Sequence, residues 1–347
     1  MIYLIITFII IILAYLEGIN KSNKFSQYAA LGIVIVMILF AGLRDKVGTD
    51  WDAYYNAYQN PNENIGFEIG YTLLNGIFGN LHIPYNCFLL FINGLSLILM
   101  YFFVKKNSIF MVIGLLVFFS DLFLYFNLSG IRQAVAMSIT CYSITFALQK
   151  QFLRFVLLVL VAACFHMTAV IFLLAYFIPK GKISKIYLLA LPALFFIGFY
   201  FLEPITEWIT VNTLKDATFY VQLQEKADSI VQLYYVGVAK RAVIILAILL
   251  FGRKLLTDSN SRYFFNLYVF GFIFFVCTYL ISPDIGVRLS SYFTIFDIVL
   301  AGNLICFVNS IKVRVAIVSI FAFIAVYKIV GYMNNDFYTY KSIFNIF

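Results

Sequence analysis

The sequence predicts an all-α integral membrane protein, a polytopic helical bundle with about 10–12 membrane segments. Hydrophobic residues make up 63% of the 347 residues and the mean hydropathy is +0.96, more apolar side chain than a soluble core of this length can bury. The apolar runs are continuous and do not alternate with polar residues, so they indicate helices and not barrel strands. We therefore treat residues 1–347 as a single membrane domain.

Apolar runs that can contribute to a bilayer crossing recur along the whole chain. A spanning helix needs roughly 20 apolar residues, so the shorter runs need flanking polar residues or a tilt. In chain order the runs are Ile2–Leu16, Ala29–Leu43, Phe88–Val104, Ile109–Phe126, Ile131–Leu148, Phe152–Ile178, Ile186–Leu202, Val236–Phe251, Tyr263–Ile281, Ser290–Val308 and Val313–Tyr332. The first run lacks a basic region before it and a cleavage pattern after it, so we expect a retained helix.

Basic residues between the runs predict the orientation. They form six clusters: Lys21 and Lys24; Lys105 and Lys106; Lys150 and Arg154; Lys180, Lys182 and Lys185; Arg253, Lys254 and Arg262; Lys312 and Arg314. By the positive-inside rule all six belong in the cytoplasm, which also accounts for the net charge of +8 without invoking nucleic acid.

Two segments must not cross the membrane completely if all six clusters share one side. The segment 67–81 is interrupted by glycine and asparagine and is expected to be an interfacial or re-entrant helix. The run 152–178 is expected to enter and return as two half-helices that meet near His166. The alternative for this run is a single tilted helix with one basic cluster on the wrong side.

Polar chemistry is expected to gather on the opposite, outer face. This face receives a polar island at 41–67 and a larger loop at 203–235, which is either a lid or sugar-stacking surface or an ordinary connector. Three arginines open toward it: Arg44, Arg132 and Arg288. An ionisable residue in the membrane costs about 2.5–3.5 kcal/mol on insertion scales, so it usually has a partner or a substrate. The planar fork of arginine suits phosphate, and the alternative is snorkelling or local ion pairs such as Arg44 with Asp45 and Arg288 with Asp284.

No metal or cofactor site is expected. The five cysteines lie in or beside apolar runs, and no His or Cys pair has the spacing of metal ligands. Asp121 and Asp297 lie within apolar runs, where we expect them to pair with each other, with backbone groups or with an arginine inside the bundle.

Five short motifs, in order along most of the chain, carry a resemblance to a known family. They are Gly42-x-Arg44-x-x-x-Gly48-Thr49-Asp50-x-x-x-Tyr54, Glu68 to Asn75, Ile131 to Ala136, Phe165 to Ala169, and Arg288-x-x-x-Tyr292-Phe293. With these motifs the chain resembles the EpsG family of exopolysaccharide and O-antigen polymerases, the Wzy-like membrane proteins. The loop at 203–235 matches no motif of the family.

The resemblance implies a membrane glycosyltransferase. It would move a growing glycan from undecaprenyl pyrophosphate to a lipid-linked oligosaccharide repeat unit on the outer face of the bacterial cytoplasmic (inner) membrane. The implied partners are these lipid-linked oligosaccharides, the bilayer and a chain-length co-polymerase. No nucleic acid and no nucleotide-binding domain is expected.

This chemistry assigns expected roles to the polar residues. A pyrophosphate leaving group needs its charge neutralised, which Arg44, Arg132 and Arg288 can do. The attacking hydroxyl needs a base or an orienting acceptor, for which the predicted residues are His166, Asp50 and Glu68. A packing role for His166 is the alternative. The residues expected to contact sugar are Trp51, Tyr54, Gln133 and Tyr292.

Two other functions remain open on sequence. A flippase or other transporter of lipid-linked oligosaccharides would also place basic residues in an outward cavity, but it should show internal repeats, and we find none. Another lipid-linked transferase, such as an O-antigen ligase or a membrane acyltransferase, would also use a histidine near an arginine. The Gly48-Thr49-Asp50 island favours the polymerase.

Overall fold

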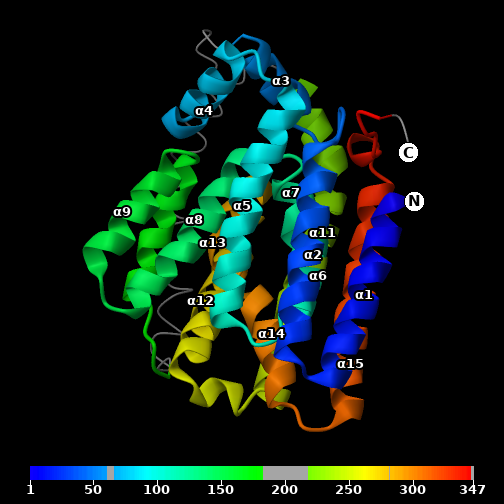
Figure 1. Cartoon of the computed structure of the whole chain (residues 1–347), viewed down its shortest axis with the longest axis vertical. Coiled ribbons are helices and arrows are strands. Elements are labelled where there is room, and N and C mark those ends of the chain that lie inside the picture. The colour runs from blue at the N-terminus through cyan, green and yellow to red at the C-terminus, as the bar shows by residue number, and fades with distance from the viewer. Residues whose placement is uncertain (61–65, 183–217, 281, 345–347) are drawn as a thin grey trace.

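The computed structural model describes residues 1–60, 66–182, 218–280 and 282–344, and Figure 1 shows them as a bundle of helices that run roughly parallel to its long axis. The helices are α1 (Ile2–Asn20), α2 (Asn23–Gly42), α3 (Trp51–Gln59), α4 (Ile69–Asn80), α5 (Tyr85–Asn107), α6 (Val112–Phe118), α7 (Leu124–Phe126), α8 (Ile131–Leu148), α9 (Phe152–Ala163), α11 (Thr218–Phe251), α12 (Ser259–Thr278), α13 (Pro283–Thr294), α14 (Asp297–Phe307) and α15 (Ile311–Met333). The π-helical turn η1 (Phe119–Phe123) joins α6 to α7, and 3₁₀ segments are η2 (Met167–Phe177), η3 (Leu255–Thr257) and η4 (Asp336–Tyr338). The described ranges contain one isolated β-bridge, between Arg44 and Ser342, and no strand.

Seven helices in these ranges are long and apolar enough to cross a membrane, and the pair α13 and α14, bent by 42°, adds an eighth. Three shorter apolar segments, at Val112–Asn127, Phe152–Ala163 and Met167–Phe177, complete the bundle. The predicted all-α polytopic fold is therefore confirmed. The predicted run at 186–202 lies outside the described residues, as does the part of the predicted outer loop at 203–217. The rest of that loop, 218–235, is the first part of helix α11.

The described basic clusters lie in or beside the turns between α1 and α2, after α5, between α8 and α9, after η2, before α12 and before α15, which are toward the lower end of the bundle in Figure 1. Lys185 lies outside the described residues. Lys21 Nζ donates to the carbonyl of Cys306 at 3.2 Å, and Lys180 Nζ donates to the carbonyl of Ala147 at 3.0 Å. Each of these bonds joins turns from distant parts of the chain. This common end is what the sequence predicted from the positive-inside rule.

The two interrupted segments take the predicted forms. Helix α4 has 12 residues and caps the opposite end of the bundle, beside α3. The run 152–178 forms a hairpin in which α9 and η2 pack against each other, with the rings of Phe155 and Phe172 6.0 Å apart. The hairpin breaks at His166, whose backbone is extended.

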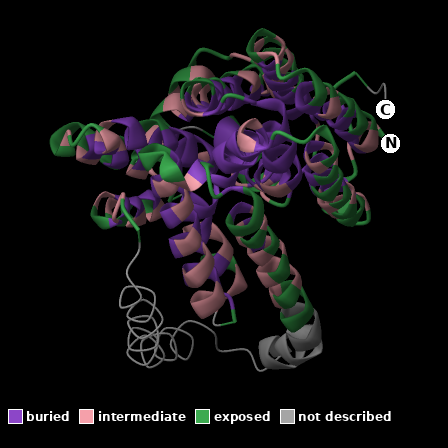
Figure 2. Cartoon of the chain, turned by 90° about the horizontal axis from the view of Figure 1, so that it is seen from below, coloured by how far each residue is buried: buried purple, intermediate pink, exposed green. Residues whose placement is uncertain are grey.

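Burial divides the spans into central and peripheral ones. Figure 2 shows the buried residues in the middle of the bundle. Helix α8 is the most buried span, with 78% of its membrane window inside the protein, whereas the membrane part of α11 (Val231–Phe251) is the least buried at 22%. Most of this part of α11 is therefore not covered by the other described residues.

A carboxylate in the membrane region fixes the start of α6. The carboxyl oxygens of Glu17, from α1, accept hydrogen bonds from the backbone N–H groups of Met111, Val112 and Ile113 at 2.8–3.1 Å and from Ser26 Oγ at 2.5 Å. The first N–H groups of a helix have no partner within the helix, and its N-terminus favours a negative charge. Glu17 therefore acts as a cap supplied by another helix.

We expect Glu17→Gln to lower the free energy of unfolding by about 2 kcal/mol or more, because an amide cannot accept from all of these donors and hydrogen bonds to a charged group are worth about 1.5–3 kcal/mol. Unfolding of the purified protein in mixed micelles, followed by circular dichroism, measures this. Asp52→Asn, at an exposed position of α3, is the matched control and should change little. Equal stability of Glu17→Gln and the wild type would contradict the capping role.

Candidate active site

Glu68 joins three segments that are distant in the chain. Its Oε1 lies 3.0 Å from His166 Nδ1 and accepts from the backbone N–H of Met167 at 3.1 Å, while its Oε2 forms an ion pair with Arg132. The partners are 98 and 64 residues away from it along the chain. The three side chains are mostly buried, with 12–18% of each exposed. The cluster therefore lies at the edge of the bundle and retains access to water.

Helix α4 supplies the backbone contacts that hold the hairpin open at this point. The N–H of Gly70 donates to the carbonyl of Cys164 at 2.7 Å, next to the bond between Met167 N–H and Glu68. A Cβ on Gly70 would lie 2.8 Å from that same carbonyl oxygen, so the approach requires glycine. Backbone groups left unpaired by the break in the apolar run are thus satisfied by α4.

Arg132 lies in the first turn of α8, where a helix presents its positive end. Its Nε donates to the hydroxyl of Tyr54 at 3.4 Å, and its guanidinium lies 4.2 Å from the centre of the Phe67 ring. Glu68 offsets the charge of Arg132. The helix end and the guanidinium both attract anions, so an anionic ligand at this position gains from both.

Helix α13 brings Arg288 to the same end of α8. Gln133 Nε2 donates to the carbonyl of Arg288 at 2.7 Å, and the hydroxyl of Tyr292 is 3.1 Å from Thr168 Oγ1, two residues after His166. The side chain of Arg288 is 29% exposed, and its Nε donates to Asp284 at 2.7 Å. The backbone of Arg288 thus lies beside α8, whereas its guanidinium forms the ion pair with Asp284 that the sequence offered as the alternative. Arg132 and His166 are brought together by Glu68.

Arg44 does not share the water-accessible hollow that the sequence predicted for the three arginines. Its guanidinium is fully buried, donates to the carbonyls of Ala41 and Val47, and lies 5.5 Å from the Trp51 ring. Burial lowers the pKa of Arg44. Its charge is satisfied by backbone oxygens and an aromatic face, and no donor is presented to a substrate.

The Gly48-Thr49-Asp50 island is a structural junction. The N–H of Gly48 donates to the carbonyl of Phe337 at 2.8 Å, and the N–H of Thr49 donates to Ser129 Oγ at 3.0 Å. Gly48 has a φ of +105°, and a Cβ there would lie 2.1 Å from the Leu128 carbonyl. Asp50 accepts from Thr49 Oγ1 at 2.9 Å and makes no hydrogen bond to Glu68 or His166. The island therefore joins the turn before α8 to the C-terminal segment.

The residues predicted to contact sugar are packed inside the protein. Trp51, Tyr54, Gln133 and Tyr292 are all buried, with at most 6% of each exposed. Their rings and amide are used in packing and hydrogen bonding: Trp51 against Tyr85 with ring centres 5.2 Å apart, and Tyr54 against Tyr71 at 5.4 Å. In this structure they offer no open surface to a glycan.

The protonation state of Glu68 follows from its partners. Burial alone would raise its pKa, but the hydrogen bonds from His166 and Met167 N–H and the charge of Arg132 lower the pKa to about 2, from an ordinary 4.5. The carboxylate is therefore ionised at neutral pH. The ionised carboxylate can only accept, so His166 donates a hydrogen bond from Nδ1–H to Glu68. Nε2 is then the ring nitrogen that can accept a proton.

A second group of charges, which the sequence did not predict, surrounds Asp121. Asp121 forms ion pairs with Lys240 and Lys328, and Arg241 lies on the next position of α11. The expectation that Asp121 pairs inside the bundle is confirmed, but its partners are lysines that lie in the middle of apolar helices. An ionisable residue within an apolar membrane helix usually has a partner or a function, so the positions of both lysines could have marked them as candidates. Among the described residues no three His, Cys, Asp or Glu side chains are grouped to hold a metal ion.

Comparison with known proteins adds one result. The model of the family described as the EpsG family matches residues 27–342. No curated protein and no solved structure matches the chain.

We expect Gly70→Ala to move α4 away from the hairpin break and to separate Glu68 from His166, because the new methyl group would overlap the Cys164 carbonyl. Gly76→Ala on the same helix is the matched control, since a Cβ there meets nothing within 4 Å. In a surface-glycan assay Gly70→Ala should lose long products while Gly76→Ala keeps them. Long products from both variants would show that the contact between α4 and the hairpin is dispensable.

Proposed function

The chain belongs to the EpsG family of membrane polysaccharide polymerases, and we propose on that premise that it transfers a growing glycan from undecaprenyl pyrophosphate to a lipid-linked repeat unit. The transfer would occur on the outer face of the bacterial cytoplasmic membrane, at the end of the bundle opposite the basic clusters. A chain-length co-polymerase is the expected protein partner. The observation that supports the proposal is the cluster of Arg132, Glu68 and His166, with Arg288 on helix α13, whose backbone contacts Gln133 of α8.

The reaction requires one base and one cluster of positive charge. A hydroxyl of the acceptor sugar attacks the anomeric carbon of the donor glycan and forms the new C–O bond. The bond between that carbon and the pyrophosphate oxygen breaks, and its electron pair leaves with the lipid pyrophosphate. The hydroxyl proton goes to His166 Nε2. Bonds, charge and proton are all accounted for by groups in the site.

Arg132 and Arg288 are assigned to the leaving pyrophosphate. A guanidinium has five N–H donors, and the contacts with Tyr54, Glu68 and Asp284 use only some of them. The nitrogens that remain can donate to phosphate oxygens, where arginine binds in a bidentate manner. Preorganised donors of this kind stabilise charge as it develops and need no movement during the reaction.

Glu68 is assigned a positioning role. A carboxylate that accepts from Nδ1 holds the imidazole ring in one orientation, keeps Nε2 free of its proton, and stabilises the imidazolium that forms when the hydroxyl proton arrives. The same carboxylate holds Arg132 near the base. Base and leaving-group site are thereby kept at a constant separation.

Replacing either accessible arginine should slow polymer formation. We expect Arg132→Gln and Arg288→Gln each to lower turnover about 10²–10³-fold, the usual effect of removing one preorganised donor. Turnover is measured with purified protein in liposomes that contain lipid-linked repeat units. Arg253 is exposed at the basic end, so Arg253→Gln is a control that removes the same charge. Its turnover should be close to that of the wild type. Wild-type turnover by both site variants would refute the assignment.

His166→Asn should lower turnover about 10²–10⁴-fold, the range for loss of a general base. The amide of asparagine can still donate to Glu68, so folding should be retained. The other histidine offers a matched control: His82 is exposed and has a φ of +52°, a conformation that asparagine tolerates. If His82→Asn and His166→Asn polymerise equally well, His166 has only a packing role.

A further inference from the structure

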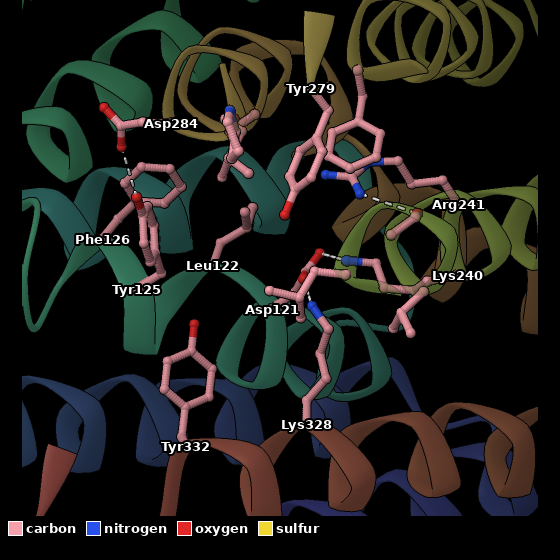
Figure 3. A pocket seen from close by; sticks show the side chains of 17 residues that line it. Asp121, Leu122, Tyr125, Phe126, Lys240, Arg241, Tyr279, Asp284, Lys328 and Tyr332 are labelled. Atoms are coloured by element: carbon pink, nitrogen blue, oxygen red, sulfur yellow. Dashed lines mark hydrogen bonds and ion pairs between the residues drawn. The ribbon is translucent and has the colours of Figure 1, made fainter. Parts of the chain in front are cut away.

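A groove that is separate from the active site runs along α11, between α13, α15 and the π-helical turn η1. Its volume is about 530 Å³. Figure 3 shows the charged side chains at its base, with Asp121 between Lys240 from α11 and Lys328 from α15. π-Helical turns occur often at functional sites because they change the direction of side chains, and here the turn carries Asp121.

The groove has more positive than negative charge at its base. Asp121 neutralises one of the two lysines, and Arg241 adds a third cation. Asp297 is buried near this group, and its Oδ1 has no hydrogen-bond partner in the described part of the chain. Asp284 also lines the groove, but it forms an ion pair with Arg288. With that pair set aside, and with Asp297 counted as ionised, three cations face two anions, so an anionic ligand would balance the charge.

Arg241 is held in place with donors to spare. Its side chain lies 3.8 Å from the centre of the Phe275 ring, and Nη1 donates to the carbonyl of Gly237 at 3.1 Å. Arg241 is 6% exposed, and its buried Nε has no partner within the described residues. A buried donor without a partner is costly, and an anion in the groove would remove that cost.

The groove opens sideways, toward lipid. A second cavity of about 610 Å³ lies between α11 and α15 and shares Leu233, Val236, Lys328 and Tyr332 with the first. The α11 side is apolar and exposed, with Leu233 58% accessible. A hydrocarbon chain can leave the groove between these two membrane helices while a charged headgroup stays at the lysines.

Helix α13 separates the groove from the active site. Asp284, Val287 and Ser291 line the groove, whereas the carbonyl of Arg288 and the hydroxyl of Tyr292 contact Gln133 and Thr168 on the other side. The side chain of Arg288 is bonded to Asp284, which lines the groove, so it is the cluster of Glu68, Arg132 and His166 that α13 separates from the groove, by about one helix diameter or roughly 10 Å.

We propose that the groove binds the pyrophosphate headgroup of the acceptor's lipid carrier. This inference rests on the proposed polymerase function, in which two lipid-linked substrates must be bound at once. The donor reacts at the carbon attached to its pyrophosphate, so that pyrophosphate must lie beside His166. The acceptor reacts at a sugar hydroxyl at the far end of its repeat unit, so its pyrophosphate must lie some distance away. The groove meets this second requirement, and no bond is made or broken in it.

Native mass spectrometry of the full-length protein with undecaprenyl pyrophosphate counts the bound lipids. We expect two on the wild type and one on the double variant Lys328→Gln with Arg241→Gln, in which the pair of Lys240 with Asp121 is retained. Arg132→Gln with Arg288→Gln should lose the other lipid, so the two sites are tested separately. Lys312→Gln, exposed at the basic end of α15, is the matched control and should bind two. Two lipids on the groove variant would overturn the inference, whereas two on the active-site variant would overturn the donor assignment instead.

Two further variants test the groove even if the double variant does not fold. Val236→Trp fills the groove without a change of charge and should also remove one lipid. Asp121→Asn frees both lysines, so it should tighten binding in the groove, a result that a merely structural ion pair would not produce. Unchanged binding in both variants would contradict the inference.

Competition and kinetics identify the occupant. Phosphatidylglycerol and inorganic pyrophosphate should not displace the groove lipid, and displacement by either would show a general anion site and overturn the acceptor assignment. In liposomes, Lys328→Gln should raise the KM for the acceptor about tenfold, the worth of one hydrogen bond to a charged group, and leave the KM for the donor unchanged. A rise only in the donor KM would overturn it as well.

Discussion

The contact of one carboxylate with three partners is the interaction on which the active site depends. Glu68 binds Arg132, His166 and the N–H of Met167, and through them it ties the short helix α4, the central helix α8 and the break of the hairpin at His166 to one another. None of these segments is covalently close to the others. A membrane interior offers few alternative partners for a charge, so the cluster is favoured over any arrangement that separates it.

The same need for pairing separates structural charges from functional ones. Glu17 and Arg44 are fully buried, and each is satisfied by backbone groups that leave no room for a ligand. Arg288 and Lys328 are paired with carboxylates but remain partly exposed, at 29% and 24%. A charge with a partner, water access and donors left over can accept a substrate, and that combination occurs on both sides of α13.

Much of the fold was predictable because it follows from local sequence. Continuous apolar runs predicted the helices. The requirement that all basic clusters lie on one side of the membrane predicted that the segment at 67–81 and the hairpin at His166 do not cross it. Grouping of Glu68, Arg132 and His166 was predictable because the sequence predicts all three on the same side of the membrane. The burial of Arg44 was not predictable, because it depends on backbone carbonyls and on the Trp51 ring, which meet it only in the folded protein. The motif around Arg44 is equally compatible with a binding site and with a structural junction. Lys240 and Lys328 pair with Asp121 only through packing of distant helices, which no local pattern reports.

The most direct test is a structure of the His166→Asn variant with its lipid-linked donor bound, since loss of the base should let the donor accumulate. The account predicts that pyrophosphate oxygens lie within about 3 Å of the terminal nitrogens of Arg132 and Arg288, with the anomeric carbon facing position 166. A donor pyrophosphate held among the basic residues at the other end of the bundle, or in the groove beyond α13 with its anomeric carbon directed away from position 166, would contradict it.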